Sequence, residues 1–380
     1  MRCILIGAVA PNKAFALLLC YNENKGVKQI AMIEITSDFT GGNINVVSIE
    51  GDTVILKNEL RDTEGDWFYW AFCVKGAGGK SITFRFEQSN RVGYYGAAVS
   101  HDLKSWHWSN SKTDSEGFTY SFADDEDCVY FAHHMLYHPD RFFELAKRVG
   151  IETQQLCLSE KGRSVPCAVI GSGDKTVLLT SRHHACESTG DYVLEGVIRS
   201  LAQQPIDGYS FFVVPFVDYD GVVDGDQGKN RAPHDHNRDY RDTIYNSTAA
   251  IKEYAESHNT VLGFDFHSPW HRGGRNDKLF FVQKCEKFVA QFNKFGKLLE
   301  QSICDGAMKY CSANDIAPNT EWNKENSPNF SNYVSNLPTC RMALSLETAY
   351  FGEDDNRFSQ DGAVLTGKCF ANAIRKYIED

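Results

Sequence analysis

The sequence of 380 residues predicts a two-domain α/β protein: an N-terminal antiparallel β-sandwich, followed by an α/β domain with a mixed, mostly parallel sheet flanked by helices. Two observations predict this fold class. Short strand-like runs separated by Gly, Asn and Asp fill the chain to about residue 132, whereas strand-like and helix-like runs alternate after residue 133. We therefore expect one domain at residues 1–135 and a second at residues 136–380, which suits ordinary domain sizes.

Residues 1–30 are the part of the first domain whose order is uncertain. CILIGAVA follows Met1-Arg2 and weakly resembles a signal peptide, and AFALLLC follows it. Neither run reaches the roughly 18–20 apolar residues that a membrane-spanning helix needs. A loosely attached leader, strand material and a cleaved signal all remain open.

The strands of the predicted sandwich begin near Ile33. Apolar runs separated by turn residues recur about every ten residues, which is typical of a β-sandwich. They are IEITSDF, INVVSIEG, DTVILKNEL, WFYWAFCVKG, SITFRFEQ and FTYSFADDEDCVYFAHH.

The second domain opens with a helix from Pro139 to Gly150. Ser188 is placed to cap a later helix, whose apolar side chains share one face. After the first helix the expected order is strand TVLLTS, helix YVLEGVIRSLAQQ, strand YSFFVVPFV, helix TIYNSTAAIKEYAESH, strand TVLGFDF, helix EKFVAQFNKFGKLLEQSI, strand RMALSLET and helix GAVLTGKCFANAIRKYI.

Charge and cysteine usage exclude some classes of function. The formal net charge of −11 argues against a nucleic-acid binder, which needs a basic surface, and disfavours anionic membranes. Twelve cysteines are scattered without a CxxC pair, which is typical of reduced thiols in a long chain. We therefore expect a cytoplasmic protein with no nucleic-acid or membrane partner.

Four polar clusters follow apolar strand-like runs in the second domain. They are His184 and Glu187 in HHACE, the loop 217–240, His267 in DFHSPW, and Glu347 in SLET. Because ligands bind at the carboxyl ends of strands in open α/β sheets, these clusters mark the candidate site.

The residue types of these clusters predict a metal centre. His184, Glu187 and His267 form a His₂Glu set, and catalytic zinc is commonly held by three such ligands with a fourth position open to water. Zinc lowers the pKa of that water to about 7. Glu347 is then the candidate general base, because a charged residue in an apolar strand rarely lies there without a partner or a function.

Each cluster alone has an ordinary explanation. HxxE arises often by chance, a histidine after a strand is usually hydrogen-bonded and structural, and a glutamate at a strand end is usually solvated. The prediction depends on all four clusters occurring in order, each at a predicted strand end.

In combination the motifs resemble the M14 superfamily of zinc carboxypeptidases, and most closely its cytosolic carboxypeptidase branch. HACE stands at the HPGE position, DYDG precedes the Asn237-Arg238 pair, DFHSPW matches the DFHxPW form, and Glu347 matches the late-strand glutamate. VGYYGAAVSHDLKSW and CVYFAHHMLYHP resemble the N-terminal domain of that branch. The resemblance spans roughly residues 33–380.

The resemblance implies one zinc ion and removal of a C-terminal amino acid from a peptide or protein tail. Asn237 and Arg238 would bind the terminal carboxylate of the substrate. The family uses an arginine to stabilise the oxyanion, but that position falls near Gly228 here. Lys229 and Arg231 are therefore both candidates, with Arg231 slightly favoured for its fixed geometry.

Three further residues are weaker candidates for substrate binding. Tyr333 is assigned the place of the family's mobile tyrosine without a matching motif. Arg272 and Arg275 either form a subsite for an acidic C-terminal residue or are part of a solvated rim.

Several neighbours of the motif residues have structural explanations. We expect Cys186 to be a buried bystander thiol and His183 to point away from the metal. Asp265 either orients a histidine ligand or is an exposed charge. His234 and His236 are expected to shape the binding loop.

Two other functions remain open. An amidohydrolase acting on acylated amino acids or cell-wall peptides could use the same residues, because the Asn-Arg pair binds any free carboxylate. A non-catalytic binding protein is disfavoured, because every predicted ligand and the predicted base are present.

Overall fold

The computed structural model describes residues 2–10, 13–21, 31–111 and 113–379. The chain forms two compact units. The first comprises residues up to 138 together with 223–227, and the second comprises 139–222 and 228 onward. The predicted boundary at 135/136 lies close to this division, but the grouping of residues 223–227 with the first unit was not predicted.

The first unit holds two sheets. The seven-stranded sheet has the order β1-β2-β3-β6-β11-β8-β9, and the four-stranded sheet has the order β10-β7-β5-β4. The pairing of β5 with β7 is parallel, which the prediction of an antiparallel domain did not include. The bounds are β1 (Arg2–Ala10), β2 (Lys13–Tyr21), β3 (Ala31–Thr36), β4 (Asn45–Glu50), β5 (Thr53–Lys57), β6 (Ala71–Lys75), β7 (Ser81–Phe86), β8 (Ala98–Ser100), β9 (Trp106–Trp108), β10 (Gly117–Ser121) and β11 (Cys128–Ala132).

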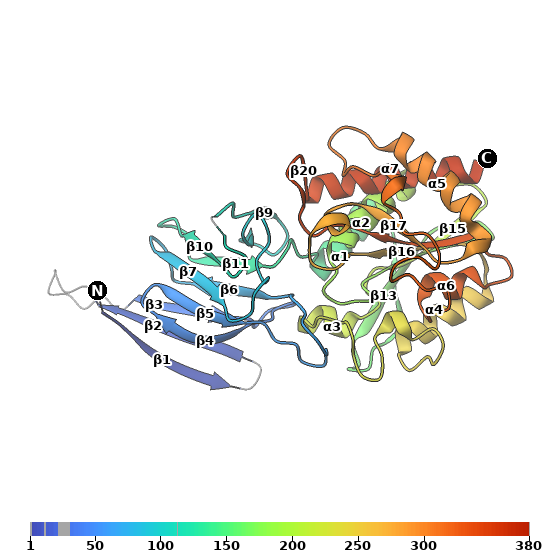
Figure 1. Cartoon of the computed structure of the whole chain (residues 1–380). Coiled ribbons are helices and arrows are strands. Elements are labelled where there is room, and N and C mark those ends of the chain that lie inside the picture. Colours follow the sequence, from blue (N-terminus) through green and yellow to red (C-terminus); the bar gives the residue numbers. More distant parts are fainter. Residues whose placement is uncertain (1, 11–12, 22–30, 112, 380) are drawn as a thin grey trace. The chain divides into compact units, whose positions relative to one another are not determined.

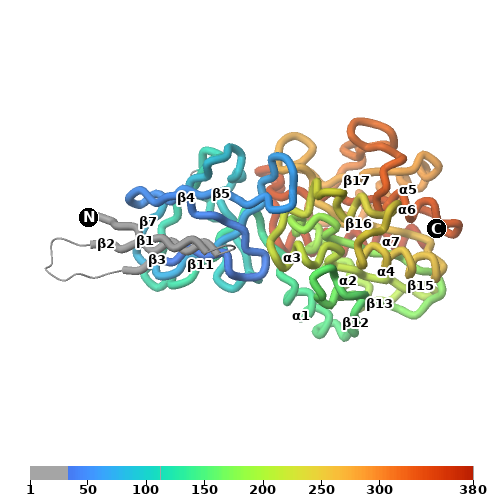
Figure 2. The backbone as a smooth tube through the Cα atoms, turned by 90° about the horizontal axis from the view of Figure 1, so that it is seen from below, coloured from blue at the N-terminus to red at the C-terminus, as the bar shows by residue number. Residues whose placement is uncertain are grey.

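Aromatic side chains from both sheets share one core. Phe72 on β6 and Phe131 on β11 contact Phe84 on β7, with ring centroids 5.1 and 5.4 Å apart. Phe118 on β10 lies 5.6 Å from Phe131. Figure 2 shows β4 and β5 in one layer of this unit and β3 and β11 in the other.

Part of the uncertain N-terminal stretch is strand. β1 pairs with β2, and β2 pairs with β3, so the backbone extends the seven-stranded sheet. Residues 22–30 lie outside the described part of the chain.

A seven-stranded mixed sheet forms the centre of the second unit, in the order β12-β13-β15-β14-β16-β18-β17. The four central strands are parallel, and the pairings at both edges are antiparallel. The expectation of a mostly parallel sheet therefore holds for the centre only. The bounds are β12 (Thr153–Leu158), β13 (Ser164–Gly171), β14 (Lys175–Ser181), β15 (Tyr209–Val214), β16 (Asn259–His267), β17 (Phe280–Gln283) and β18 (Met342–Glu347), with a separate hairpin of β19 (Gly352–Glu353) and β20 (Asn356–Arg357).

Helices cover both faces of this sheet. Figure 1 shows α2, α5 and α7 on one face and α4 and α6 on the other. Phe264 on β16 packs on Phe295 and Phe370 of the first group, whereas Leu178 shares a core with Ile251 and Phe330 of the second. The bounds are α1 (Pro139–Val149), α2 (Thr189–Gln203), α3 (Tyr219–Asp224), α4 (Asn246–Ser257), α5 (Val289–Ser302), α6 (Phe330–Ser335) and α7 (Gln360–Glu379).

The predicted helices and strands of the second domain are all present, but some strands were missed. β12 and β13 were not predicted, and neither was the four-residue β17, which is too short to show a period. Ser188 does lie at the N-cap of α2, but its side chain does not cap the helix. In the described part of the chain, no helix combines the length and the apolar character needed to cross a membrane.

Candidate metal centre and substrate cavity

The carboxyl ends of three parallel strands carry the predicted site residues. β14 ends at Ser181, and the turn after it carries His184 and Glu187, closed by a hydrogen bond from the Glu187 N–H to the His184 carbonyl (3.1 Å). His267 is the last residue of β16, and Glu347 is the last residue of β18. These two residues are register partners on adjacent strands, so the fold brings them together from positions 80 residues apart.

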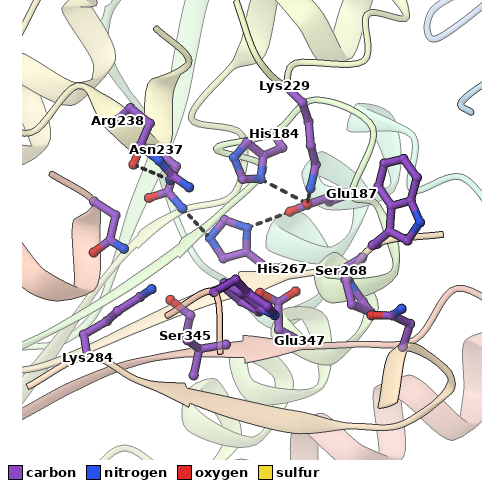
Figure 3. Close-up of a pocket in the computed structure, with 16 residues that line it drawn as sticks. His184, Glu187, Lys229, Asn237, Arg238, His267, Ser268, Lys284, Ser345 and Glu347 are labelled. Atoms are coloured by element: carbon purple, nitrogen blue, oxygen red, sulfur yellow. Dashed lines mark hydrogen bonds and ion pairs between the residues drawn. The ribbon is translucent and has the colours of Figure 1, made fainter. Parts of the chain in front are cut away.

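The three predicted metal ligands converge. One ligand atom from each of His184, Glu187 and His267 lies within 4.8 Å of the others, and all three residues are buried. His267 Nδ1 lies 2.6 Å from Glu187 Oε2, and His184 Nδ1 lies 3.0 Å from Glu187 Oε1. Figure 3 shows the three side chains pointing toward one another, with Glu347 beneath His267.

The charges around Glu187 oppose the effect of its burial. Burial alone would raise the pKa of this carboxyl, but His184, Lys229 and His267 hold its pKa well below the ordinary value. Burial would likewise lower the pKa of His267, but Asp265 and Glu187 hold it well above the ordinary value. The two carboxylates therefore favour a positive charge at this position, which the His267 proton supplies and which a bound cation would supply in its place.

Unsatisfied polar atoms show that these residues fit a metal ion. Within the described chain, His184 Nδ1 and Glu347 Oε2 are buried without a hydrogen bond, and so is Asp235 Oδ1, which faces His184 Nε2 at 3.6 Å. Buried polar atoms are normally paired, so several orphans at one place indicate a missing partner. Two imidazole nitrogens and a carboxylate are also a common donor set for a catalytic metal.

Glu347 lies beside this cluster rather than in it. The side chain is 8% exposed and lines the same cavity as the three ligands. Burial raises its pKa, His267 opposes the shift, and the neighbouring Glu187 carboxylate adds to it. A carboxylate in this environment is a stronger base than an exposed glutamate.

The two candidates for the oxyanion-stabilising cation lie in different places. Lys229 lines the cavity and forms an ion pair with Glu187. Burial would lower the pKa of Lys229, but the Glu187 carboxylate raises it above the ordinary value. Arg231 is buried against Asp218, with which it forms an ion pair, and it is not among the described residues that line the cavity. The slight preference for Arg231 has no support in this geometry.

Asn237 and Arg238 both line the cavity. Asn237 is buried, and its Oδ1 accepts a hydrogen bond from the Phe330 N–H (3.2 Å). Arg238 is exposed, and its Nη1 donates to the Asn237 carbonyl (3.0 Å). Both side chains can therefore reach a ligand beside the metal cluster.

The cavity has a volume of about 250 Å³. It is lined by His184, Glu187, Lys229, Asn237, Arg238, His267, Ser268, Pro269, Trp270, Asn276, Val282, Lys284, Trp322, Asn329, Ser345 and Glu347.

Three predicted substrate-binding residues are not part of that lining in the described structure. The Tyr333 hydroxyl donates to Glu256 (2.6 Å) on the α4 side of the sheet. Arg275 forms an ion pair with Glu321 (2.5 Å), and Arg272 precedes the short turn that contains Arg275. The geometry gives these three residues no contact with a ligand beside the metal cluster.

Lys284 is a charged residue of the cavity lining that was not predicted from the sequence. It directly follows β17, is only 6% exposed, and its Nζ lies 5.4 Å from the ring centre of Trp322. Burial lowers its pKa to about 8, with Arg238 contributing to the shift. A lysine directly after the run FFVQ was the available signal, but β17 runs antiparallel to β18, so the rule for the carboxyl ends of parallel strands does not apply to it.

The residues beside the motifs have structural contacts. Cys186 is buried, and burial raises the pKa of its thiol to about 11, so it is not ionised at neutral pH. His234 Nε2 lies 2.6 Å from Asp239 Oδ1, and the His236 ring stacks on Tyr245 with centroids 3.7 Å apart. These histidines hold the loop that carries Asn237.

Comparison with known proteins gives relatives for both units. Residues 35–134 match the family described as the cytosolic carboxypeptidase N-terminal domain. An uncharacterized protein from Zymomonas mobilis is 24% identical over 252 residues, which cover 62% of this chain and 66% of that protein. Cytosolic carboxypeptidase 2 from Xenopus tropicalis is 26% identical over 180 residues, which cover 40% of this chain and 19% of that protein. The chain thus spans less than two thirds of either relative.

A solved structure shows the same fold. The metallo-carboxypeptidase from Burkholderia cenocepacia superposes with a TM-score of 0.73 over 91% of this chain and 99% of that chain, at 20% identity. The chain therefore has the fold of that metallo-carboxypeptidase. Its first unit matches the cytosolic carboxypeptidase N-terminal domain, and its sequence is similar to cytosolic carboxypeptidases, in agreement with the resemblance seen in the motifs.

Proposed function

We propose that this protein is a zinc metallocarboxypeptidase that hydrolyses the last peptide bond of a peptide or protein tail. The observation that carries the proposal is the meeting of His184, Glu187, His267 and Glu347 in one cavity that also contains the Asn237-Arg238 pair. The enzyme would hold one zinc ion through His184, Glu187 and His267.

Each residue has a distinct part in the proposed reaction. A zinc ion bound there supplies a Lewis acid that polarises the scissile carbonyl and acidifies a water. Glu347 accepts a proton from the attacking water and delivers it to the leaving amine. Arg238 and Asn237 bind the terminal carboxylate, and Lys229 stabilises the oxyanion that develops on the scissile carbonyl.

We further propose a preference for acidic C-terminal residues, with Lys284 as the cation that selects them. Arg272 and Arg275 are the residues that the sequence suggests for this role, but neither is among the described residues that line the cavity. Lys284 Nζ lies in the same cavity as Arg238 and is buried, so a substrate carboxylate would meet a partly desolvated ammonium. A charged hydrogen bond of this kind contributes about 1.5–3 kcal/mol.

A peptide panel tests both parts of the proposal. Peptides that differ only in the last residue (Glu, Gln, Leu or Lys) are incubated with the zinc-loaded protein, with and without a chelator, and products are identified by mass spectrometry. We expect loss of one residue, abolished by the chelator. Failure to cleave any of these peptides would contradict a carboxypeptidase, and cleavage of acylated amino acids or cell-wall peptides instead would establish the amidohydrolase alternative.

The Lys284→Met variant tests the specificity. We expect kcat/KM for the Glu-ending peptide to fall about 10-fold to 150-fold, with little change for the Leu-ending peptide. Lys278→Met is the matched control, because Lys278 pairs with Glu353 outside the cavity. An equal loss on both peptides would assign Lys284 to general stability rather than to specificity.

The pH dependence provides a second check on Lys284. Its pKa is lowered to about 8, so the ammonium that binds a carboxylate is present below pH 8 and is lost above it. The preference for Glu over Gln should therefore decline as the pH rises through about 8, whereas the Lys284→Arg variant should keep it. A wild-type preference that is constant from pH 7 to 9 would argue against this role.

The cysteines support a reducing compartment. All ten cysteines in the described side-chain set are free thiols, including the buried Cys73, Cys167 and Cys186. We therefore propose a cytoplasmic enzyme whose partner is its peptide or protein substrate.

A further inference from the structure

His183 and Tyr240 are buried polar residues that the proposed reaction does not use. His183 has no exposed surface, and Tyr240 is 4% exposed. His183 directly precedes a metal ligand, whereas Tyr240 follows the Asn237-Arg238 pair in the substrate-binding loop. Buried polar side chains of this kind are retained in a core only when they are fully hydrogen-bonded.

A continuous chain of hydrogen bonds joins these two residues to the ligand His267. Tyr240 Oη lies 2.7 Å from His183 Nε2, and His183 Nδ1 lies 2.8 Å from Asp265 Oδ1. The second Asp265 oxygen, Oδ2, lies 2.6 Å from His267 Nε2. Thr180 also donates to Asp265 Oδ1 (2.8 Å), so both oxygens of this carboxylate are engaged.

The Asp265 carboxylate sets the donors and acceptors along these hydrogen bonds, because it lies closer to His267 Nε2 (2.6 Å) than the Asn237 Nδ2 amide nitrogen does (3.2 Å). The Asp265 carboxylate accepts, so His183 donates from Nδ1 and His267 donates from Nε2. His183 Nε2 must then accept, and the Tyr240 hydroxyl donates to it. This leaves Nδ1 of His267, which lies 2.6 Å from Glu187 Oε2, as the nitrogen that can bind a metal ion once it carries no proton. These hydrogen bonds thus favour the tautomer of His267 in which Nδ1 can bind a metal.

The same geometry excludes a separate metal site at these residues. His183, Asp265 and His267 also lie within 4.8 Å of one another and could be considered as a second ligand set. However, of these three residues only His267 is among the described residues that line the cavity, whereas His183 and Asp265 have no exposed surface. The set is therefore a hydrogen-bonded support for the ligand His267.

We propose that His183 and Tyr240 are positioning residues for the metal centre: they lock Asp265, and through it the ring orientation and tautomer of His267. The proposal rests on the metal site of the proposed function. Because Tyr240 belongs to the loop that contains Asn237, the same chain ties the substrate-binding loop to a metal ligand. Loss of either residue weakens metal binding although neither touches the ion.

Zinc affinity of the full-length protein tests this proposal directly. The zinc dissociation constant is measured by competition with a chromophoric chelator for the wild type, Tyr240→Phe, His183→Asn and His183→Leu. Substitutions behind a histidine ligand typically reduce metal affinity about 10-fold to 100-fold. We expect losses of zinc affinity of about 10-fold for Tyr240→Phe and His183→Asn, because each variant keeps some of the hydrogen bonds that link Tyr240 to His267. We expect a loss of about 100-fold for His183→Leu.

Tyr310→Phe is the matched control. Its hydroxyl is also a buried hydrogen-bond donor, in this case to the Asp315 carboxylate (2.8 Å), but it takes no part in the hydrogen bonds that link Tyr240 to His267. We expect Tyr310→Phe to bind zinc as tightly as the wild type, even where thermal unfolding shows that both tyrosine variants lose similar stability. The absorption spectrum of bound Co²⁺ should change in Tyr240→Phe and not in Tyr310→Phe, because it reports ligand geometry.

The outcomes separate this proposal from the proposed function. If the wild type binds zinc and Tyr240→Phe and His183→Asn bind it equally well, His183 and Tyr240 are structural residues only. If His183→Leu does not fold, the two milder variants still decide the question. If the wild type itself binds no zinc, both the metal site and its supporting chain are overturned.

Discussion

At the scale of single residues, the site depends on polar side chains that lack ordinary partners. Glu347 is the clearest case, because it combines burial, a raised pKa and an oxygen without a hydrogen bond in the described chain. An oxygen of this kind is free to receive a proton. Arg231, by contrast, is held in an ion pair with Asp218 and is not among the described residues that line the cavity, so it is set apart from the residues of the proposed site.

The Glu347→Gln variant tests the role of this oxygen. We expect kcat to fall about 10²-fold to 10⁴-fold, because an amide cannot accept the proton, while the zinc dissociation constant stays near the wild-type value. Steady-state kinetics and chelator competition measure the two quantities. Glu379→Gln, at an exposed position on α7, is the control. Activity retained by Glu347→Gln would require another base.

At the residue scale, the sequence predicts the position of a polar side chain where it directly follows an apolar strand. His267 and Glu347 lie at the ends of β16 and β18 as expected, because the apolar run shows where each strand ends. The choice between Lys229 and Arg231 could not be predicted, since both lie in one irregular loop and only the fold shows that Asp218 engages the arginine. The hydrogen bonds that link Tyr240 to His267 could not be predicted either, because they join residues from three separate segments of the sequence.

At the scale of elements, the position of α2 depends on a close approach to α7. A Cβ on Gly196 would lie 1.9 Å from the Val364 carbonyl oxygen, and a Cβ on Gly367 would lie 1.9 Å from the Val193 carbonyl oxygen. These are backbone atoms, which cannot rotate away. Because α2 begins directly after the turn that carries His184 and Glu187, this contact fixes the start of the metal site.

Replacing either glycine with alanine should therefore destabilise the protein. Alanine favours the helix by about 1 kcal/mol, but overpacking typically costs about 1–3 kcal/mol and here requires the helices to separate. We expect a net loss of about 1 kcal/mol or more in the free energy of unfolding for Gly196→Ala, measured by denaturant titration. Asn372→Ala, at an exposed position of α7, should be neutral or slightly stabilising. A stabilised Gly196→Ala would show that the helices can move apart freely.

Elements could be predicted from the sequence when they are long and strongly periodic. The central strands β14, β16 and β18 are buried apart from the first residue of β14 and of β16, and they contain long apolar runs. The missed strands β12 and β17 lie at the edges of the sheet, where a strand is polar on one side or very short. Missing β17 also meant missing Lys284, because that lysine is recognisable only as a residue at a strand end.

At the scale of the whole molecule, the proposed metal ligands connect parts of the second unit that are far apart in the chain. His184 and Glu187 follow β14, whereas His267 ends β16 about 80 residues later. An ion bound by all three acts only on the folded state, because the unfolded chain does not hold these residues together. Binding energy at this site is therefore also folding energy.

Zinc removal should accordingly loosen the second unit and leave the first unit unchanged. At a free zinc concentration 1,000 times the dissociation constant, bound metal stabilises the folded state by about 4 kcal/mol. We expect a chelator to remove this stabilisation and to speed hydrogen exchange around residues 184–187, 265–267 and 345–347, while β6 and β11 exchange as before. The His184→Ala variant should show no difference with or without zinc. Faster exchange across both units would mean that the metal acts on the whole chain rather than on the unit that contains its ligands.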